Sequence, residues 1–302
     1  MQFNFKGTLV LRCFYRGFFT YFWDKWESVK KIGRQKALFS SFMAISSKTK
    51  KILEDAYQRH HNSDFIKDDP LQIPHEFSSL QDIEIMAFFS SILAWGQRKT
   101  IINNCRKLIS IFNGQPHDFI LSHSSVDLKN LLGFKHRTFN DTDLLYFVAF
   151  LKHHYSTHES LEDAFVQGMS PNDEDVTGAL VGFHDYFTSL EFFPSRTRKH
   201  IATPARNSAC KRLNMFLRWM VRVDDQAIDF GLWTQINPSQ LLCPLDVHVE
   251  RQARALGLIK RKQRDFKTVI ELSNNLRKID PIDPIRFDFA LFGMGIASKD
   301  PF

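Results

Sequence analysis

The chain has 302 residues and a formal net charge of +7, with 43% hydrophobic and 24% charged residues. These proportions are typical of a globular protein that buries a substantial apolar core. The cysteines form no C-x-x-C pair, which excludes the usual ligand spacing of zinc and iron–sulfur sites, so we expect no metal and no other cofactor. Their wide spacing also favours a reducing cytoplasm over a disulfide framework. They are Cys13, Cys105, Cys210 and Cys243.

The net charge is distributed unevenly along the chain. Residues 1–42 carry +6, residues 43–194 carry −7, and residues 195–302 carry +8. Basic side chains can contact phosphates, whereas an acidic segment repels them. Any nucleic-acid-binding surface is therefore expected on one side of the protein, in the C-terminal third.

Residues 1–42 differ in character from the rest of the chain. Eight aromatic residues lie between positions 14 and 26, interleaved with Lys and Arg. A basic, aromatic segment could lie at a membrane surface. It lacks the ~20 uninterrupted apolar residues of a spanning helix, and no small-residue cleavage site follows it. We interpret it as an N-terminal extension with Met43 as the true start, and expect no stable membrane association.

From Met43 onward the apolar spacing is helical and predicts one all-α domain over residues 43–302. Apolar residues at positions 85, 88, 89 and 92 follow helical spacing, and Ser78 with Gln81 predicts a capping box before them. A last helix is predicted to begin at Asp283 and Pro284, an N-cap and N1 pair. No alternating strand pattern of useful length is present.

Three segments carry residues that a helical core alone does not require. Gly96 ends a predicted helix and leaves Gln97 and Arg98 in a turn. Lys211 begins an amphipathic helix, and Asp246 immediately precedes another one. A lysine amine can attack the anomeric carbon of a nucleotide as that carbon loses its base, giving a Schiff base. The developing cation needs a nearby anion, and a helix N-terminus favours the ionised form of an aspartate by roughly 0.3–1 kcal/mol.

These segments resemble the helix-hairpin-helix DNA glycosylases, the group that contains endonuclease III and the 8-oxoguanine DNA glycosylases. The run P-L-D-V-H-V-E-R at 244–251 is similar to the family's V-D-T-H-V-x-R segment, whose aspartate is catalytic and corresponds to Asp246. The step S-A-C-K at 208–211 resembles the G-x-G-x-K-T-A hairpin, which places Lys211 at the Schiff-base position. The turn W-G-Q-R at 95–98 resembles the S-Q-Q-T segment, whose glutamine contacts DNA and corresponds to Gln97.

The resemblance covers roughly residues 81–295. Two runs are closer still to an uncharacterised bacterial family related to that superfamily: K-R-L-N-M-F-L-R-W-M-V-R and F-A-L-F-G-M-G. It implies a glycosylase-like helical domain with a central cleft. Three features depart from the parent pattern. Asn207 and Ala209 replace the hairpin glycines. The separation of 35 residues between the lysine and the aspartate is closer to that of the archaeal 8-oxoguanine branch than to that of endonuclease III. The C-terminal cysteines that bind an iron–sulfur cluster are missing.

Further roles are assigned to cations and aromatic residues near these segments. We expect DNA contacts from Gln97, Arg98, Arg206, Arg212 and Arg218, with Arg212 also lowering the pKa of Lys211 through its charge. Trp219 and Trp233 are candidates for stacking on an extruded base, and His248 is expected to bond buried backbone. Adjacent histidines at 60–61 and 153–154 point in different directions on a helix, so they predict no metal site.

The sequence therefore predicts a monomeric, cytoplasmic base-excision enzyme that binds double-stranded DNA containing an altered base or an abasic site. Lys211 would be the nucleophile and Asp246 its electrostatic partner, with AP-lyase activity through the Schiff base. Two alternatives remain open. The missing hairpin glycines favour a nucleic-acid-binding protein of the same fold without catalysis. The charge of +1 over residues 43–302 favours a helical interaction module with no nucleic-acid ligand.

Overall fold

The computed structural model describes residues 45–297. The chain divides after Ser46 into two units, and the described helices belong to the second unit. The predicted N-terminal extension over residues 1–42, and its boundary at Met43, lie outside the described residues. In the part that is described, no helix combines the length and the apolar character needed to cross a bilayer.

The prediction of an all-α fold is confirmed, because helices account for nearly all the regular structure of the described residues. They are α2 (Ser47–His60), α3 (Asp64–Lys67), α4 (Leu80–Leu93), α5 (Arg98–Ile111), α6 (Pro116–Ser122), α7 (Asp141–Tyr155), α8 (Glu162–Val166), α9 (Thr177–Phe187), α10 (Lys211–Val221), α11 (Val247–Ala255), α12 (Phe266–Arg277) and α13 (Phe287–Ala297), together with short 3-10 turns. One antiparallel hairpin joins β1 (Lys135–His136) to β2 (Phe139–Asn140). Strands of two residues are too short for an alternating pattern to reveal.

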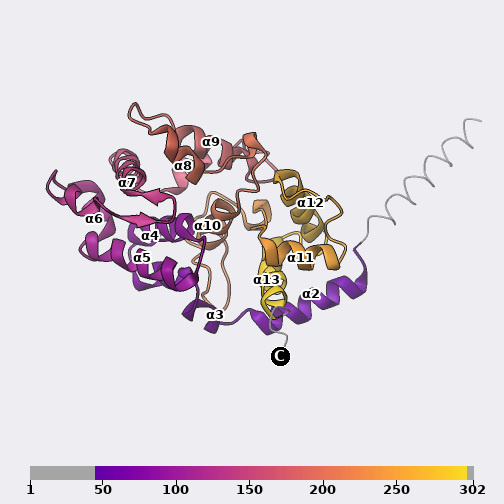
Figure 1. Cartoon of the computed structure of the whole chain (residues 1–302). Coiled ribbons are helices and arrows are strands. Elements are labelled where there is room, and N and C mark those ends of the chain that lie inside the picture. The colour runs from indigo at the N-terminus through magenta and orange to yellow at the C-terminus, as the bar shows by residue number, and fades with distance from the viewer. Residues whose placement is uncertain (1–44, 298–302) are drawn as a thin grey trace, which may run out of the picture. The chain divides into compact units, whose positions relative to one another are not determined.

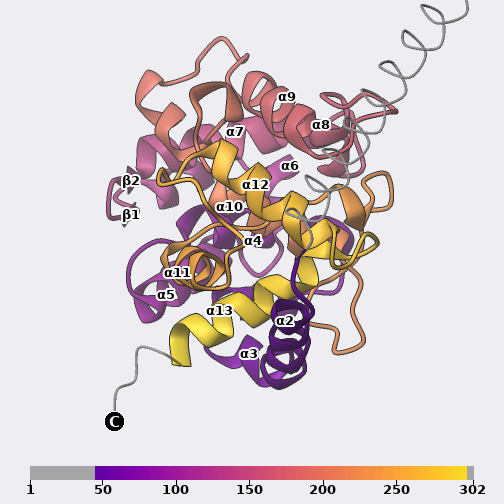
Figure 2. The same cartoon turned by 90° about the vertical axis from the view of Figure 1, so that its right-hand side faces the viewer.

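Helix α10 occupies the middle of the second unit (Figures 1 and 2). It packs on α4, which stands with α5, α6 and α7 on one side of it. Helix α13 packs on α2 and on α11 on the other side. The N-terminus of α10 therefore faces segments that are distant in sequence.

Phenylalanine rings fill the core around α4, α7, α9 and α10. Phe88 on α4 is fully buried and contacts rings from three other helices, at centroid distances of 5.5–5.7 Å. Phe165 and Phe183 stack with centroids 4.0 Å apart. Each buried aromatic ring removes a large apolar area from water, so this cluster supplies much of the stabilisation of the fold.

Two glycines of α13 allow its close packing on α2 and α11. A Cβ atom at Gly293 would lie 2.2 Å from the ring of His60 on α2. A Cβ atom at Gly295 would lie 2.6 Å from His248 Cβ and 3.0 Å from its backbone. Real Cβ atoms do not approach other atoms this closely, so α13 reaches both neighbours only because these side chains are absent.

Two predicted helix starts differ in detail from the structure. Helix α4 is capped by Ser79, one residue later than expected, and its hydroxyl accepts a bond from the Asp82 backbone N–H. Asp283 precedes a 3-10 turn rather than an α-helix, and its side chain makes no capping bond. Its carboxylate instead binds Arg222, 2.9 Å away. A long-range ion pair thus replaces the local cap at Asp283.

Glu84 of α4 is a buried carboxylate at the centre of a polar cluster. Its Oε1 accepts bonds from the Ser160 hydroxyl (2.5 Å) and the Trp233 indole N–H (2.6 Å), and its Oε2 from the Tyr155 hydroxyl (2.8 Å) and the Leu161 N–H (3.0 Å). Burial raises the pKa of Glu84, and these bonds act in the opposite direction. The cluster joins α4 to α7, α8 and the loop after α10.

We expect Glu84→Gln to lower the free energy of unfolding by about 2 kcal/mol or more. The new amide would point donors at two existing donors, and each buried group left without a partner costs roughly 1–3 kcal/mol. Urea denaturation measures the loss. Glu76→Gln, at an exposed position, is the matched control and should change stability by no more than about 0.5 kcal/mol. Equal stability of the two variants would contradict the importance of the buried cluster.

Candidate active site

A cavity of about 240 Å³ lies where the N-termini of α10 and α11 meet the turn before α5 and one face of α13. Lys211 and Asp246 both line it, although 35 residues separate them in sequence. Lys211 is the first residue of α10, and Asp246 is the N-cap of α11. The structure therefore brings the two residues predicted to carry the chemistry to one cavity.

Asp246 is held firmly by the helix that it caps. Its Oδ1 accepts bonds from the backbone N–H groups of His248 (2.8 Å) and Val249 (2.9 Å). Both bonds go to one oxygen, so Oδ2 has no hydrogen-bond partner among the described residues. The ring of His248 bonds the Gly295 carbonyl oxygen at 3.0 Å, as its predicted structural role requires.

The segment before Lys211 keeps a strongly turned backbone although its glycines are replaced. Asn207 and Cys210 both adopt left-handed conformations, with φ of 56° and 48°. Asparagine tolerates this region better than most residues, which is why it can stand in for glycine. The side chain of Asn207 donates to Asp265 Oδ2 at 3.2 Å, which links the turn before α10 to the N-terminus of α12.

Two further carboxylates line the cavity, and the sequence analysis missed both. Asp69 caps a 3-10 turn and accepts a bond from the Leu71 N–H at 3.1 Å; burial raises its pKa, while nearby cations oppose the shift. Asp288 lies on α13 and is 5% exposed. Burial, reinforced by the charge of Asp246, raises the pKa of Asp288 to about 6 against the effects of Arg218 and Lys211. A lone acid in the apolar run F-D-F-A-L-F is the signal that could have identified Asp288.

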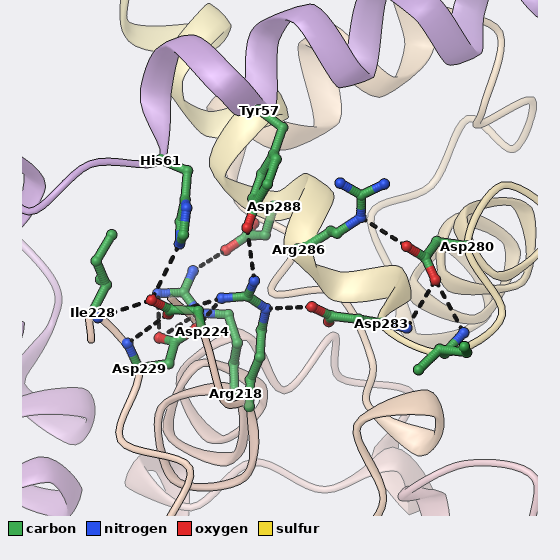
Figure 3. Close-up of polar contacts among 12 residues, drawn as sticks. Tyr57, His61, Arg218, Asp224, Ile228, Asp229, Asp280, Asp283, Arg286 and Asp288 are labelled. Atoms are coloured by element: carbon green, nitrogen blue, oxygen red, sulfur yellow. Dashed lines mark hydrogen bonds and ion pairs between the residues drawn. The ribbon is translucent and has the colours of Figure 1, made fainter. Parts of the chain in front are cut away.

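Arg218 is part of a buried arginine–aspartate cluster rather than a contact for phosphates, so its predicted role in DNA binding is wrong. Its guanidinium lies 2.5 Å from Asp288 and 3.2 Å from Asp229, and the residue is 4% exposed. Figure 3 shows Arg218 between these two carboxylates. Because the guanidinium is buried between these two carboxylates, it cannot reach a DNA backbone. The cluster comprises Arg218, Arg222, Asp224, Asp229, Asp283 and Asp288.

Arg212 also points inward, which corrects its predicted role in contacting DNA. Its guanidinium donates to the carbonyl oxygens of Ile92 (2.6 Å) and His200 (3.2 Å). Ile92 lies in the last turn of α4, where carbonyl groups lack helical partners. Burial lowers the pKa of Arg212 to about 10. Arg212 thus anchors α10 to the end of α4.

The remaining predicted DNA-binding residues are exposed. Gln97 is the N-cap of α5 and makes no capping bond with its side chain. Arg98 follows it, lines the cavity and lies 5.8 Å from the ring of Phe292. Arg206 ends the 3-10 turn before the hairpin. These three side chains are accessible to a ligand outside the cavity.

Aromatic side chains form part of the cavity wall. Trp219 lines it but is only 1% exposed, so its predicted stacking on an extruded base stays a prediction. Trp233 does not line it: its indole N–H donates to Glu84 in the core, so its predicted pocket role is wrong. The sequence analysis overlooked Trp95, which lines the cavity and carries the guanidinium of Arg137 over its ring at 4.9 Å. The β1–β2 hairpin supports this turn further, because the ring of His136 bonds the Trp95 carbonyl oxygen at 3.1 Å.

One group of described residues has the spacing of metal ligands. Ligand atoms of His61, Asp224 and Asp225 lie within 4.8 Å of one another. Both oxygens of Asp224 already accept bonds, from Arg222 and from three backbone N–H groups of the loop after α10. These bonds use the lone pairs that a cation would need, so we assign the group to loop structure.

Comparison with known proteins gave a match to one family, and the matched residues include those that line the cavity. The sequence model of the family described as "Protein of unknown function (DUF2400)" matches residues 69–297. This range includes every residue that lines the cavity. Neither the curated proteins nor the solved structures gave a match.

Arg212, which points inward, and Arg206, which is exposed, should respond differently to substitution. We expect Arg212→Gln to lower the free energy of unfolding by about 1–3 kcal/mol, because two carbonyl oxygens lose their donors. Arg206→Gln is the matched control, since its side chain is exposed, and should change stability by about 0.5 kcal/mol or less. Chemical denaturation compares them, and equal losses would contradict the anchoring role of Arg212.

Proposed function

The chain belongs to the DUF2400 family, whose description assigns no function, and we propose from its cavity that it is a DNA base-excision glycosylase. Lys211 is the nucleophile and Asp246 is its electrostatic partner. The observation that carries the proposal is the convergence of this amine and this carboxylate on one cavity that is also lined by Trp95 and Trp219.

The arrangement suits cleavage of an N-glycosidic bond. As the base departs, positive charge develops on the sugar ring, and a fixed carboxylate stabilises that charge most strongly in the transition state. Asp246 is fixed by two backbone N–H groups and has Oδ2 available. The amine of Lys211 then forms a bond to the anomeric carbon, and the resulting Schiff base permits strand cleavage.

The size and lining of the cavity favour one planar ring as its occupant. Its volume of about 240 Å³ is below the roughly 300–1,000 Å³ of pockets for drug-sized ligands. Trp95 is partly exposed on the cavity wall and provides a surface of the kind on which an extruded base stacks. Gln97, Arg98 and Arg206 are exposed outside or at the rim, where they can meet the DNA backbone. The excess of basic residues after position 195 supports the same orientation.

A nucleic-acid-binding protein without catalysis is the second candidate. Ala209 occupies the place of a hairpin glycine, and Cys210, rather than residue 209, takes the second left-handed conformation. This change alters which backbone N–H groups the hairpin can present to a phosphate. Such a protein would bind duplex DNA in a salt-dependent manner but form no covalent intermediate.

We expect Lys211→Gln to abolish borohydride trapping on DNA with an abasic site while leaving duplex affinity nearly unchanged. Only one amine forms the bond, whereas binding is spread over several cations, each adding one increment to the salt dependence. Lys99→Gln is the matched control: it removes an exposed amine close to Arg98 and should still trap. Trapping that persists in Lys211→Gln would show that another amine is the nucleophile.

Asp246→Asn should bind duplex DNA normally but excise a base on the order of 100–1,000-fold more slowly, because the amide cannot supply the counter-charge. Single-turnover excision measures this rate. Wild-type protein that binds duplex but never traps, over a panel of damaged and abasic substrates, would instead support the non-catalytic binder.

A further inference from the structure

We infer that Asp288 accepts the ammonium proton of Lys211 before the amine attacks, and returns a proton to the departing base. This inference rests on the proposed function and adds a residue to the same site. Asp288 has no counterpart among the motifs that indicated Lys211 and Asp246, and its assignment comes from its place in the cavity.

Asp288 is positioned by the arginine–aspartate cluster. One oxygen, Oδ2, lies 2.5 Å from Nη1 of Arg218, and that arginine is in turn held by Asp229 at 3.2 Å. The other oxygen, Oδ1, lies 3.8 Å from the sulfur of Cys243, a weak donor. Asp288 therefore reaches the cavity with one oxygen in a strong ion pair and the other weakly bonded.

The charged groups around Asp288 come from several elements. Arg218 and Lys211 on α10 favour its carboxylate form, whereas Asp246 at the start of α11 favours the protonated form. Asp69 and Arg98 lie on other parts of the cavity wall. Buried in this setting, Asp288 has its pKa raised to about 6, so it is a carboxylate at neutral pH that can still take up a proton readily.

The three cavity carboxylates are placed for different tasks. Asp246 accepts two backbone N–H bonds at a helix N-terminus, which suits a fixed counter-charge. Asp69 is the N-cap of its own 3-10 turn, and its carboxylate accepts a bond from the Leu71 N–H. Asp288 alone among them combines burial with an arginine that fixes its direction. Pairs of acids held in different environments are a common way to divide acid and base roles within one site.

The proton and electron balance closes without another reactant. The ammonium of Lys211 gives its proton to the Asp288 carboxylate and becomes a neutral amine. The amine nitrogen forms a bond to C1′ as the C1′–N bond to the base breaks, and the electron pair leaves with the base. The base takes a proton from the Asp288 carboxyl group, which restores the carboxylate and leaves the positive charge on the new C1′-bound nitrogen.

The test is the pH dependence of cyanoborohydride trapping on abasic-site DNA, under single-turnover conditions between about pH 5 and pH 9. The wild-type rate should rise with pH through an inflection near the Asp288 pKa of about 6, because only the carboxylate accepts a proton. Asp288→Asn should lose that inflection and trap on the order of 10²–10⁴-fold more slowly at neutral pH. Its rate should approach the wild-type rate at high pH, where solvent removes the proton.

Asp283→Asn is the matched control, because Asp283 belongs to the same cluster through Arg222 but does not line the cavity. It should keep the wild-type inflection. Duplex affinity and the thermal melt of each variant show whether it folds, and Asp288→Glu, which keeps the carboxyl group, should restore the inflection if Asp288→Asn is unstable.

A second measurement does not depend on activity. The carboxyl C=O stretch of Asp288, identified as the infrared band missing from Asp288→Asn, should titrate at higher pH in Lys211→Gln than in the wild type, since Lys211 favours the carboxylate. An Asp288 band that titrates identically with and without Lys211 would overturn the inference.

The outcomes separate the two proposals. Wild-type protein that traps, with an Asp288→Asn variant of the same pH profile, overturns the role of Asp288 alone. Loss of the inflection in Asp69→Asn rather than in Asp288→Asn assigns the proton acceptor to Asp69 and also overturns the inference. Wild-type protein that never traps overturns the proposed function, and the role of Asp288 falls with it.

Discussion

The buried arginine–aspartate cluster is the interaction on which the rest of the second unit depends. Its two guanidinium groups belong to Arg218 in the last turn of α10 and to Arg222, the C-cap of that helix. They contact four carboxylates from the following loop and from the C-terminal segment. Arg222 also donates to the Tyr57 hydroxyl at 3.0 Å, which brings α2 into the same network. Helices with no sequence proximity are thereby fixed around α10. Removing one partner from such a network leaves a buried charge uncompensated, at a cost of roughly 3–5 kcal/mol.

The cluster also links fold to site, because Arg218 and Asp288 belong to both. Arg218 connects the wall of the cavity to the loop after α10, and Asp288 presents a carboxylate whose surroundings are set by the helices that meet there. Four carboxylates outnumber two guanidinium groups, so the interior holds excess negative charge. The raised pKa of Asp288 has a different main cause, because it comes first from burial of the carboxyl group and then from the charge of Asp246.

The sequence was informative where chemistry is local. Apolar spacing predicted helices correctly, and an aspartate before a helix predicted the cap at Asp246, which depends only on the neighbouring N–H groups. It gave wrong predictions for long side chains whose hydrogen-bond partners are distant in the sequence. Arg212 and Arg218 look like surface cations in an amphipathic helix, yet both turn inward to groups more than 10 positions away. Trp233 likewise binds Glu84, 149 positions earlier. No periodicity in the chain encodes such contacts.

The glycines of α13 complicate any survey of tolerated substitutions. Gly293 and Gly295 lie against His60 and His248 with no room for even a methyl group. A deep mutational scan under selection would therefore record both as intolerant, beside Lys211, although neither donates a side chain to the cavity. The two causes differ in what they do to protein abundance: a blocked helix contact depletes folded protein in the cell, whereas loss of an amine leaves it plentiful and inactive. Measuring protein abundance and activity in parallel would separate residues that are required for folding around this site from residues that are required for its chemistry.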